Sequence, residues 1–199
     1  MSVVGVDPGL NGAIAHNDKG VIEIIDMPTY EITIGKGKQT KTRKRVDAVA
    51  LYEHMAYLKM YGVTLVVLEE VGGRPGESAS GAFQFGWAAA VVYMACIALE
   101  LPIKSVKPGE WKKVMGVPGK KDGRGKDMTD QDKKAADKAA EGMIVQRADE
   151  IMPAYRQLWR GPRGGLQLDR AEAALLSVYG ATHVNQGTWN NEQYKDADA

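Results

Sequence analysis

Two short apolar runs and one long one divide the chain into its main elements. Residues 3–6 and residues 63–68 are rich in β-branched side chains and too short for helices, which is typical of strands covered on both faces. Residues 83–101 form a much longer, nearly all-apolar run that predicts a helix ended by Pro102. The pattern therefore predicts an α/β protein with a sheet packed against helices.

Weaker signals between these runs predict the remaining elements. The short apolar runs 13–15 and 21–25 are expected to be strands joined by a hairpin turn at residues 17–20, and residues 103–106 are expected to be a further strand. Capping residues and helical spacing of apolar side chains predict helices at residues 48–61, 108–113, 130–152 and 168–181. No internal repeat interrupts this series.

Both central strands end in carboxylates. The first run stops at Asp7, directly before a Pro-Gly turn, and the second stops at Glu69 and Glu70. A buried strand that ends in a carboxylate is costly unless a cation or a donor meets it. Asp169 and Glu172 are three residues apart near the start of the last helix and can share one helix face. Each acid taken alone also fits a helix cap or a surface charge.

The net charge of the chain is close to zero, but one segment is strongly basic. The 199 residues are 44% hydrophobic and 26% charged, which is ordinary for one globular domain, and the formal net charge is +1. Residues 36–45 nevertheless carry six cations and no acid, and this pattern favours nucleic-acid contact over a solvated face. The six cations are Lys36, Lys38, Lys41, Arg43, Lys44 and Arg45. We expect residues 28–45 to form a mobile arm or an extended hairpin.

Cysteine and histidine usage narrows the chemistry. Cys96 stands alone in an apolar run, and with no signal peptide and no apolar stretch long enough to span a bilayer, we expect a reduced, soluble, intracellular protein. His16, His54 and His183 lie far apart, which disfavours a zinc site. Carboxylate ligands alone suit Mg²⁺, with Mn²⁺ able to substitute, and a pair of such ions can hydrolyse a phosphodiester.

Three segments carry a resemblance to a known family. Residues 5–9 (GVDPG), 68–71 (LEEV) and 169–173 (DRAEA) resemble, in order and approximate spacing, the catalytic segments of RuvC-type Holliday junction resolvases, particularly the bacteriophage versions. Residues 83–86 (FQFG) and 108–113 (PGEWKK) are similar to that family too, so the likeness covers roughly residues 1–181.

The resemblance implies a fold, an activity and a set of site residues. The fold would be ribonuclease H-like: a mixed five-stranded sheet, with its first three strands antiparallel, flanked by α-helices. The chain would act as a homodimer in the cytoplasm of a bacterial cell or a phage-infected host, cutting four-way DNA junctions by paired, metal-dependent nicks. The metal ligands would be Asp7, Glu69, Asp169 and Glu172, and Lys112, Lys113, Lys133 and Lys134 would lie near phosphates of the DNA.

The sequence also departs from the family pattern. The last acid of the family is often aspartate, whereas Glu172 stands here. The family's base-stacking aromatic residue after the strand-end glutamate is replaced by a Val-Gly-Gly segment, so Phe83 or Phe85 is the candidate for stacking on junction bases, with a core role as the alternative. The resemblance favours Glu69 over Glu70 as the metal ligand, and a bulge in the strand would exchange their roles.

Other functions use the same acids. A Mg²⁺-dependent exonuclease or RNA:DNA-hybrid nuclease on the same fold, and a catalytically inactive junction-binding module, stay open as alternatives. An actin-like ATPase is disfavoured because residues 8–12 contain no hydroxyl side chain for a phosphate loop. We expect one nuclease domain over residues 1–184, with the basic arm at 28–45, followed by a polar, disordered tail at 185–199.

Overall fold

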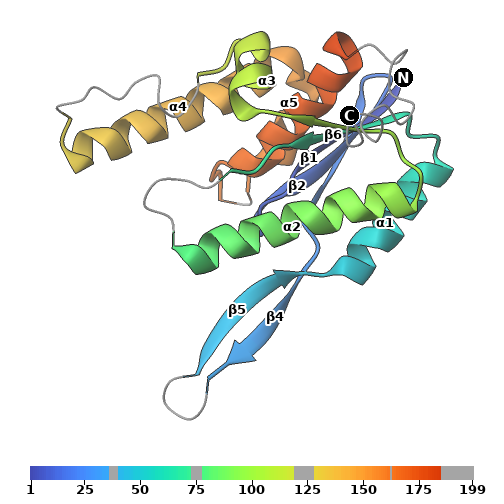
Figure 1. Cartoon of the computed structure of the whole chain (residues 1–199). Coiled ribbons are helices and arrows are strands. Elements are labelled where there is room, and N and C mark those ends of the chain that lie inside the picture. The colour runs from blue at the N-terminus through green and yellow to red at the C-terminus, as the bar shows by residue number, and fades with distance from the viewer. Residues whose placement is uncertain (36–39, 73–77, 119–127, 162, 185–199) are drawn as a thin grey trace, which may run out of the picture.

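A five-stranded mixed sheet forms the centre of the chain, as the family resemblance implies (Figure 1). The computed structural model describes residues 1–35, 40–72, 78–118, 128–161 and 163–184. The strand order is β3-β2-β1-β6-β7, in which β1 pairs antiparallel with β2 and parallel with β6, β2 pairs antiparallel with β3, and β6 pairs parallel with β7. The strands are β1 Ser2–Asp7, β2 Ala13–Asp18, β3 Val21–Asp26, β6 Leu65–Glu69 and β7 Ile103–Val106.

Helices cover both faces of this sheet, and each face has its own hydrophobic core (Figure 1). Helices α1 (Ala48–Met60) and α2 (Ala79–Ala98) lie on one face. Helix α5 (Leu168–His183) lies on the other face. Three further elements pack around α5: α3 (Pro108–Met115), α4 (Asp130–Ile151) and the 3-10 helix Pro153–Trp159.

The two central strands supply side chains to both cores in alternation. In β1, Val3 belongs to the α5 core, whereas Val4 and Val6 belong to the α1–α2 core. In β6, residues 65 and 67 face α5, and residues 66 and 68 face α1 and α2. This double burial explains why both strands read as continuous apolar runs without a polar face. It also fixes which face each strand-end residue joins.

Glycine lets α5 lie directly on β1. A Cβ atom added to Gly5 would stand 2.2 Å from the Ala173 carbonyl oxygen and 2.4 Å from the Ser177 backbone nitrogen. Later in the helix, a Cβ atom on Gly180 would stand 2.5 Å from Val67 Cγ2 and 2.8 Å from Val3 Cγ1. Contacts this short leave no room for any side chain, so these two glycines set the distance between helix and sheet.

The segment expected as a basic arm contains a second, separate sheet. Strands β4 (Thr29–Ile34) and β5 (Lys41–Val46) pair antiparallel with each other and form a ribbon that projects away from the main sheet (Figure 1). The expected tail, residues 185–199, and the cations Lys36 and Lys38 lie outside the described residues.

The expectation that no stretch could span a bilayer is wrong by length and composition. Helix α2 is long enough and apolar enough to span one, although core helices of soluble proteins pass the same test, and 22% of its most apolar window is buried.

Helix α2 begins four residues earlier than predicted. The Ser78 hydroxyl accepts a hydrogen bond from the Gly81 N–H and thereby caps the helix.

We predict that Gly5→Ala destabilises the protein by at least about 2 kcal/mol, because the new methyl group meets backbone atoms that cannot move aside. Gly142→Ala in α4 is the matched control, since a Cβ atom there meets nothing within 4 Å. It should stabilise the helix by about 0.5–1 kcal/mol. Urea unfolding followed by circular dichroism measures both variants, and equal stability of the two would contradict the tight α5–β1 contact.

Candidate metal centre

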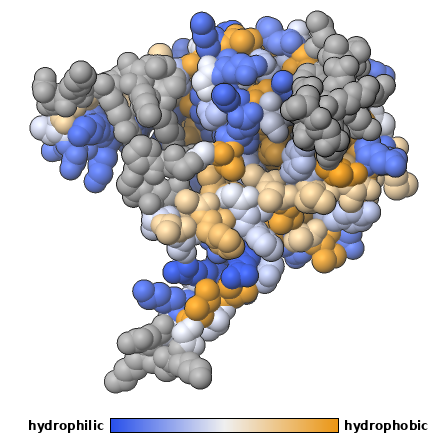
Figure 2. Space-filling view, in the orientation of Figure 1, coloured by the Kyte–Doolittle hydropathy of each residue, from blue (hydrophilic) through white to orange (hydrophobic). Residues whose placement is uncertain are grey.

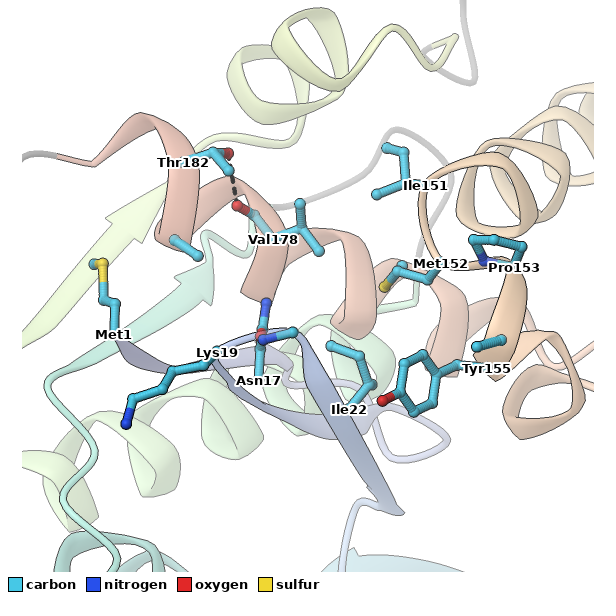
Figure 3. Close-up of a pocket in the computed structure, with 13 residues that line it drawn as sticks. Met1, Asn17, Lys19, Ile22, Ile151, Met152, Pro153, Tyr155, Val178 and Thr182 are labelled. Carbon is cyan, nitrogen blue, oxygen red and sulfur yellow. Dashed lines mark hydrogen bonds between the residues drawn. The ribbon is translucent and has the colours of Figure 1, made fainter.

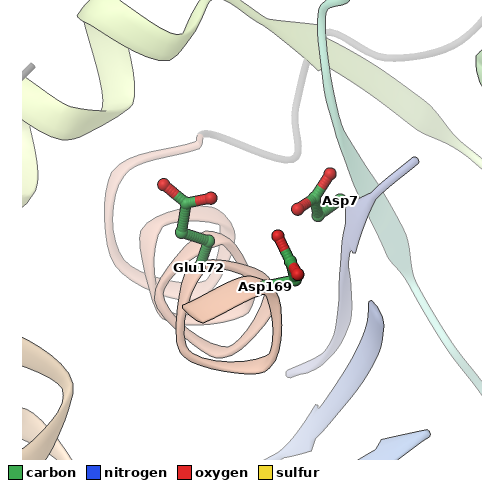
Figure 4. Close-up of side chains that lie close together, drawn as sticks. All are labelled: Asp7, Asp169 and Glu172. Carbon is green, nitrogen blue, oxygen red and sulfur yellow. The ribbon is translucent and has the colours of Figure 1, made fainter. Parts of the chain in front are cut away.

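Three buried or half-buried carboxylates converge at the carboxyl end of β1 (Figure 4). Asp7 comes from the last residue of β1, and Asp169 and Glu172 come from the first turns of α5. Each offers one oxygen, and these oxygens all lie within 4.8 Å of one another. The close α5–β1 contact through Gly5 therefore brings together acids that are more than 160 residues apart in the sequence.

The start of α5 is anchored by Arg170. Its guanidinium group donates to both carboxylate oxygens of Asp26 at the end of β3, at 2.6 and 2.7 Å, and to the Leu158 carbonyl at 3.1 Å. These hydrogen bonds hold the pKa of Asp26 below its usual range. Gln167, rather than Asp169, is the N-cap residue of α5, so the helix-cap interpretation of Asp169 is wrong.

Glu69 joins the same edge of the sheet. It follows the alternation of β6 onto the α5 face, is 6% exposed, and its Oε1 accepts a 2.9 Å hydrogen bond from the Trp111 indole N–H. The negative charge of Glu69 raises the pKa of Asp7. Glu70 is exposed, and its backbone N–H continues the pairing with Val106 at 2.8 Å. The strand therefore directs Glu69 toward the acids without a bulge.

Lys112 places a buried ammonium group between two of these acids. Its Nζ donates a 2.6 Å hydrogen bond to Glu172 Oε1 and lies 4.0 Å from Glu69 Oε1. It also lies 5.1 Å from the centroid of the Trp111 ring. Helix α3, which follows β7, presents both residues inward as one unit. Sequence reasoning expected Lys112 near phosphate and missed Trp111, because neither contact has a local signal.

The cluster carries more negative charge than Lys112 can offset. Burial is the largest cause that raises the pKa of Asp7 well above its usual range, and the charges of Glu172, Glu69 and Asp169 raise it further. The Gly9 N–H, which donates to Asp7 Oδ1 at 3.1 Å, acts in the opposite direction. A buried set of this kind is stabilised by an additional cation.

The donor set fits a hard divalent ion. Asp7, Asp169 and Glu172 offer carboxylate oxygens at ligand spacing, and Glu69 lies on the same face of the sheet. Oxygen-only sites of this type suit Mg²⁺ or Mn²⁺ rather than zinc. The three histidines of the chain do not join the group with metal-ligand spacing found among the described residues. The chain can therefore hold a divalent metal at this edge.

The other predicted site residues lie in different places. Lys113 is exposed on α3. Lys133 and Lys134 lie in the first turns of α4, which extends away from the sheet in Figure 1, and Lys133 pairs with Asp130 at 3.4 Å. The structure brings neither of them to the acids.

The two candidate stacking residues face in different directions. Phe83 is 64% exposed, and its ring centroid lies 6.4 Å from that of Trp87. Phe85 is half-buried and lines a cavity of about 390 Å³ with Leu10 and Arg43. A Cβ atom on Gly9 would lie 3.8 Å from the Phe85 ring and 3.5 Å from Asp7 Oδ1, so Phe85, which lines this cavity, lies close to the Gly9 backbone beside Asp7.

A second cavity, of about 400 Å³, is lined by other residues than the acids (Figure 3). Met1, Asn17, Lys19 and Tyr155 are among its lining residues, and it lies at the amino end of β1. The acids lie at the opposite end of the same strand, about 16 Å along six residues.

No protein-family model matches the sequence, and a search of curated proteins finds no match either. Among solved structures, Thermus thermophilus RuvC in complex with a Holliday junction substrate aligns over 94% of this chain and 98% of its own, with a TM-score of 0.52 and 13% identity. A second structure of Thermus thermophilus RuvC aligns over 91% and 95%, with a TM-score of 0.46 and 18% identity. The first alignment shows that this chain has the ribonuclease H-like fold of RuvC.

We predict that Mn²⁺ raises the melting temperature of the protein, because it binds the folded acid cluster. Asp7→Asn should abolish this shift, and so should Glu69→Gln, whereas the exposed Glu70→Gln should keep it. Differential scanning fluorimetry with and without Mn²⁺ measures all four proteins. Loss of the shift in Glu70→Gln with retention in Glu69→Gln would reverse the assignment.

The same experiment without metal tests the electrostatics. Because the folded protein raises the pKa of Asp7, ionised Asp7 costs stability above the ordinary carboxyl pKa of about 4. Metal-free Asp7→Asn should therefore melt at a higher temperature than the unmodified protein at pH 8, and this difference should vanish as the pH falls toward 4.

Proposed function

We propose that this chain is a structure-selective DNA endonuclease that resolves four-way junctions by metal-dependent hydrolysis of phosphodiesters. The observation that carries the proposal is the convergence of Asp7, Asp169 and Glu172 within 4.8 Å at the carboxyl end of the central strand. Further support comes from the ordered sequence motifs and from the fold shared with a RuvC whose solved complex contains a Holliday junction substrate. The bacteriophage subtype and a cytoplasmic location stay predictions from the sequence.

The acids and the two residues that contact them have different roles in this proposal. Asp7, Asp169 and Glu172 would hold Mg²⁺, with Glu69 as a further ligand from the same edge of the sheet. The ion would supply the positive charge that phosphodiester hydrolysis requires and would activate water. Trp111 fixes the Glu69 carboxylate through the 2.9 Å hydrogen bond. Lys112 orients Glu172 and offsets part of the negative charge that would otherwise repel the DNA backbone.

The proposed endonuclease is a homodimer that uses the exposed face of α2. Paired nicks on a junction require two active sites related by symmetry, and a twofold interface places the same surface on both subunits. Phe83, Trp87 and Met94 are 64%, 50% and 59% exposed at helical spacing, and α2 contains no charged residue. Figure 2 shows hydrophobic residues gathered over this helix. Exposed Gly86 and Ala90 between them permit close helix packing.

We predict that Trp87→Glu converts a dimer into a monomer, because it places a charge in the centre of the apolar interface. Met60→Glu is the control, since Met60 is 86% exposed on α1 and lies outside this face. Sedimentation velocity measures the mass of each protein. A monomeric unmodified protein, or an unchanged mass for Trp87→Glu, would contradict the α2 interface.

The test of the activity compares substrates. With Mg²⁺, the purified protein should nick a synthetic four-way junction much faster than linear duplex, RNA:DNA hybrid or single strand. Asp7→Asn should lose nicking and keep junction binding, because it removes a metal ligand and no cation that meets phosphate. Faster cleavage of hybrid or of DNA ends would favour the alternative nucleases, and binding without cleavage in any metal would favour an inactive module.

A further inference from the structure

The β4–β5 ribbon has two different faces. Residues paired across an antiparallel ribbon lie on the same face, and successive residues alternate between faces. Three pairs therefore share the face that we call the cationic face: Tyr30 with Arg45, Ile32 with Arg43, and Ile34 with Lys41. Each of these pairs joins one cation to one large apolar or aromatic side chain.

The opposite face has a different charge balance. Lys44 is paired there with Glu31, and it also contributes to the low pKa of Asp26 on the main sheet. The remaining pairs on this face, Thr29 with Val46 and Thr33 with Thr42, carry no charge. Three of the four cations described on β5 thus share one face, and the fourth lies beside acids.

Arg43 on the cationic face contacts the start of α2. Arg43 donates a 2.8 Å hydrogen bond to the Ser80 hydroxyl at the start of α2. Arg43 also lines the cavity of about 390 Å³ that reaches Leu10 and Phe85, and Phe85 approaches the Gly9 backbone beside Asp7. The cavity therefore joins Arg43 on the ribbon to Phe85, which lies next to the Gly9 backbone beside Asp7.

The exposed apolar residues on this face distinguish it from a solvated charge face. Tyr30 is 47% exposed and Ile34 is 42% exposed, and each stands opposite a cation. Figure 2 shows hydrophobic and hydrophilic residues side by side on the ribbon. A charge that serves solubility needs no apolar neighbour, whereas duplex DNA offers phosphates for the cations and sugar or base surfaces for apolar side chains.

Resting on the proposed nuclease function, we propose that the cationic face of the β4–β5 ribbon binds a duplex arm of the DNA and directs one strand past α2 to the acids. A two-stranded ribbon fits a DNA groove, and alternate residues on β5 place a cation about every 6.6 Å. Lys41 and Arg43 contact phosphates, with Arg45 deeper at the base of the ribbon. Lys44 does not belong to this surface, although it lies in the same basic segment.

Two neighbouring substitutions test this proposal. Arg43→Gln and Lys44→Gln remove the same charge from adjacent positions on opposite faces. Fluorescence anisotropy without divalent metal measures binding of a four-way junction and of a linear duplex between 50 and 200 mM salt. Arg43→Gln should weaken binding of both DNAs and reduce the slope of log K against log salt by about 1, whereas Lys44→Gln should change the slope by much less.

Lys41→Gln provides a second variant, because Lys41 lies two residues along the cationic face from Arg43 and its hydrogen bond to Ser80. It should also reduce the slope by about 1, and the double variant with Arg43→Gln by about 2. Circular dichroism checks that each variant is folded. Equal effects of Arg43→Gln and Lys44→Gln would overturn the face assignment, and unchanged slopes in all variants would overturn DNA binding by the ribbon.

The outcome is separable from that of the proposed function. If the unmodified protein nicks junctions and the ribbon variants bind DNA as it does, the ribbon inference fails and the nuclease stands. If the unmodified protein binds neither junction nor duplex, both fail together. If the slopes respond as predicted but no nuclease activity exists in any metal, the ribbon is a DNA-binding element of an inactive module.

Discussion

The site depends on the contact between α5 and β1. The missing side chains of Gly5 and Gly180 allow the helix backbone to lie against the sheet, and this contact sets the distance from Asp7 to Asp169 and Glu172. A helix held even one side chain farther from the strand could not bring the carboxylates of Asp169 and Glu172 within reach of the strand end. The same packing of α5 on β1 therefore determines both the core and the geometry of the site. Arg170 adds to it by binding Asp26, which holds the first turn of α5 in place.

Repulsion among the buried acids destabilises the folded protein, whereas the packing of α5 on β1 brings these acids together. Burial and the neighbouring acids make ionised Asp7 unfavourable, and Lys112 offsets only part of the charge. Two hydrophobic cores, one on each face of the sheet, supply the stability that tolerates this cost. Such an arrangement is expected of a site that is selected for binding a cation and is less favourable without one.

The sequence predicts the elements and the acids better than it predicts their partners. Asp7 and Glu69 are visible because a buried strand that ends in a carboxylate is a local pattern. The contact of Trp111 and Lys112 with Glu69 and Glu172 joins distant segments, and no local pattern records it. The sequence also does not show that the basic ribbon has two different faces. A count of charges treats Arg43 and Lys44 alike, whereas the pairing of β5 with β4 places them on opposite faces.

The ribbon enters and leaves the body of the protein at nearly one point. The Asp47 N–H donates to the Pro28 carbonyl at 2.9 Å, directly where β4 begins and β5 ends, and neither strand pairs with the five-stranded sheet. The segment from Pro28 to Asp47 thus resembles an insertion whose two ends lie next to each other. Its length and composition can change during evolution without moving either helical layer. If the ribbon binds DNA as proposed, it is a part of the molecule in which new preferences for DNA shape can arise while the acid cluster stays the same.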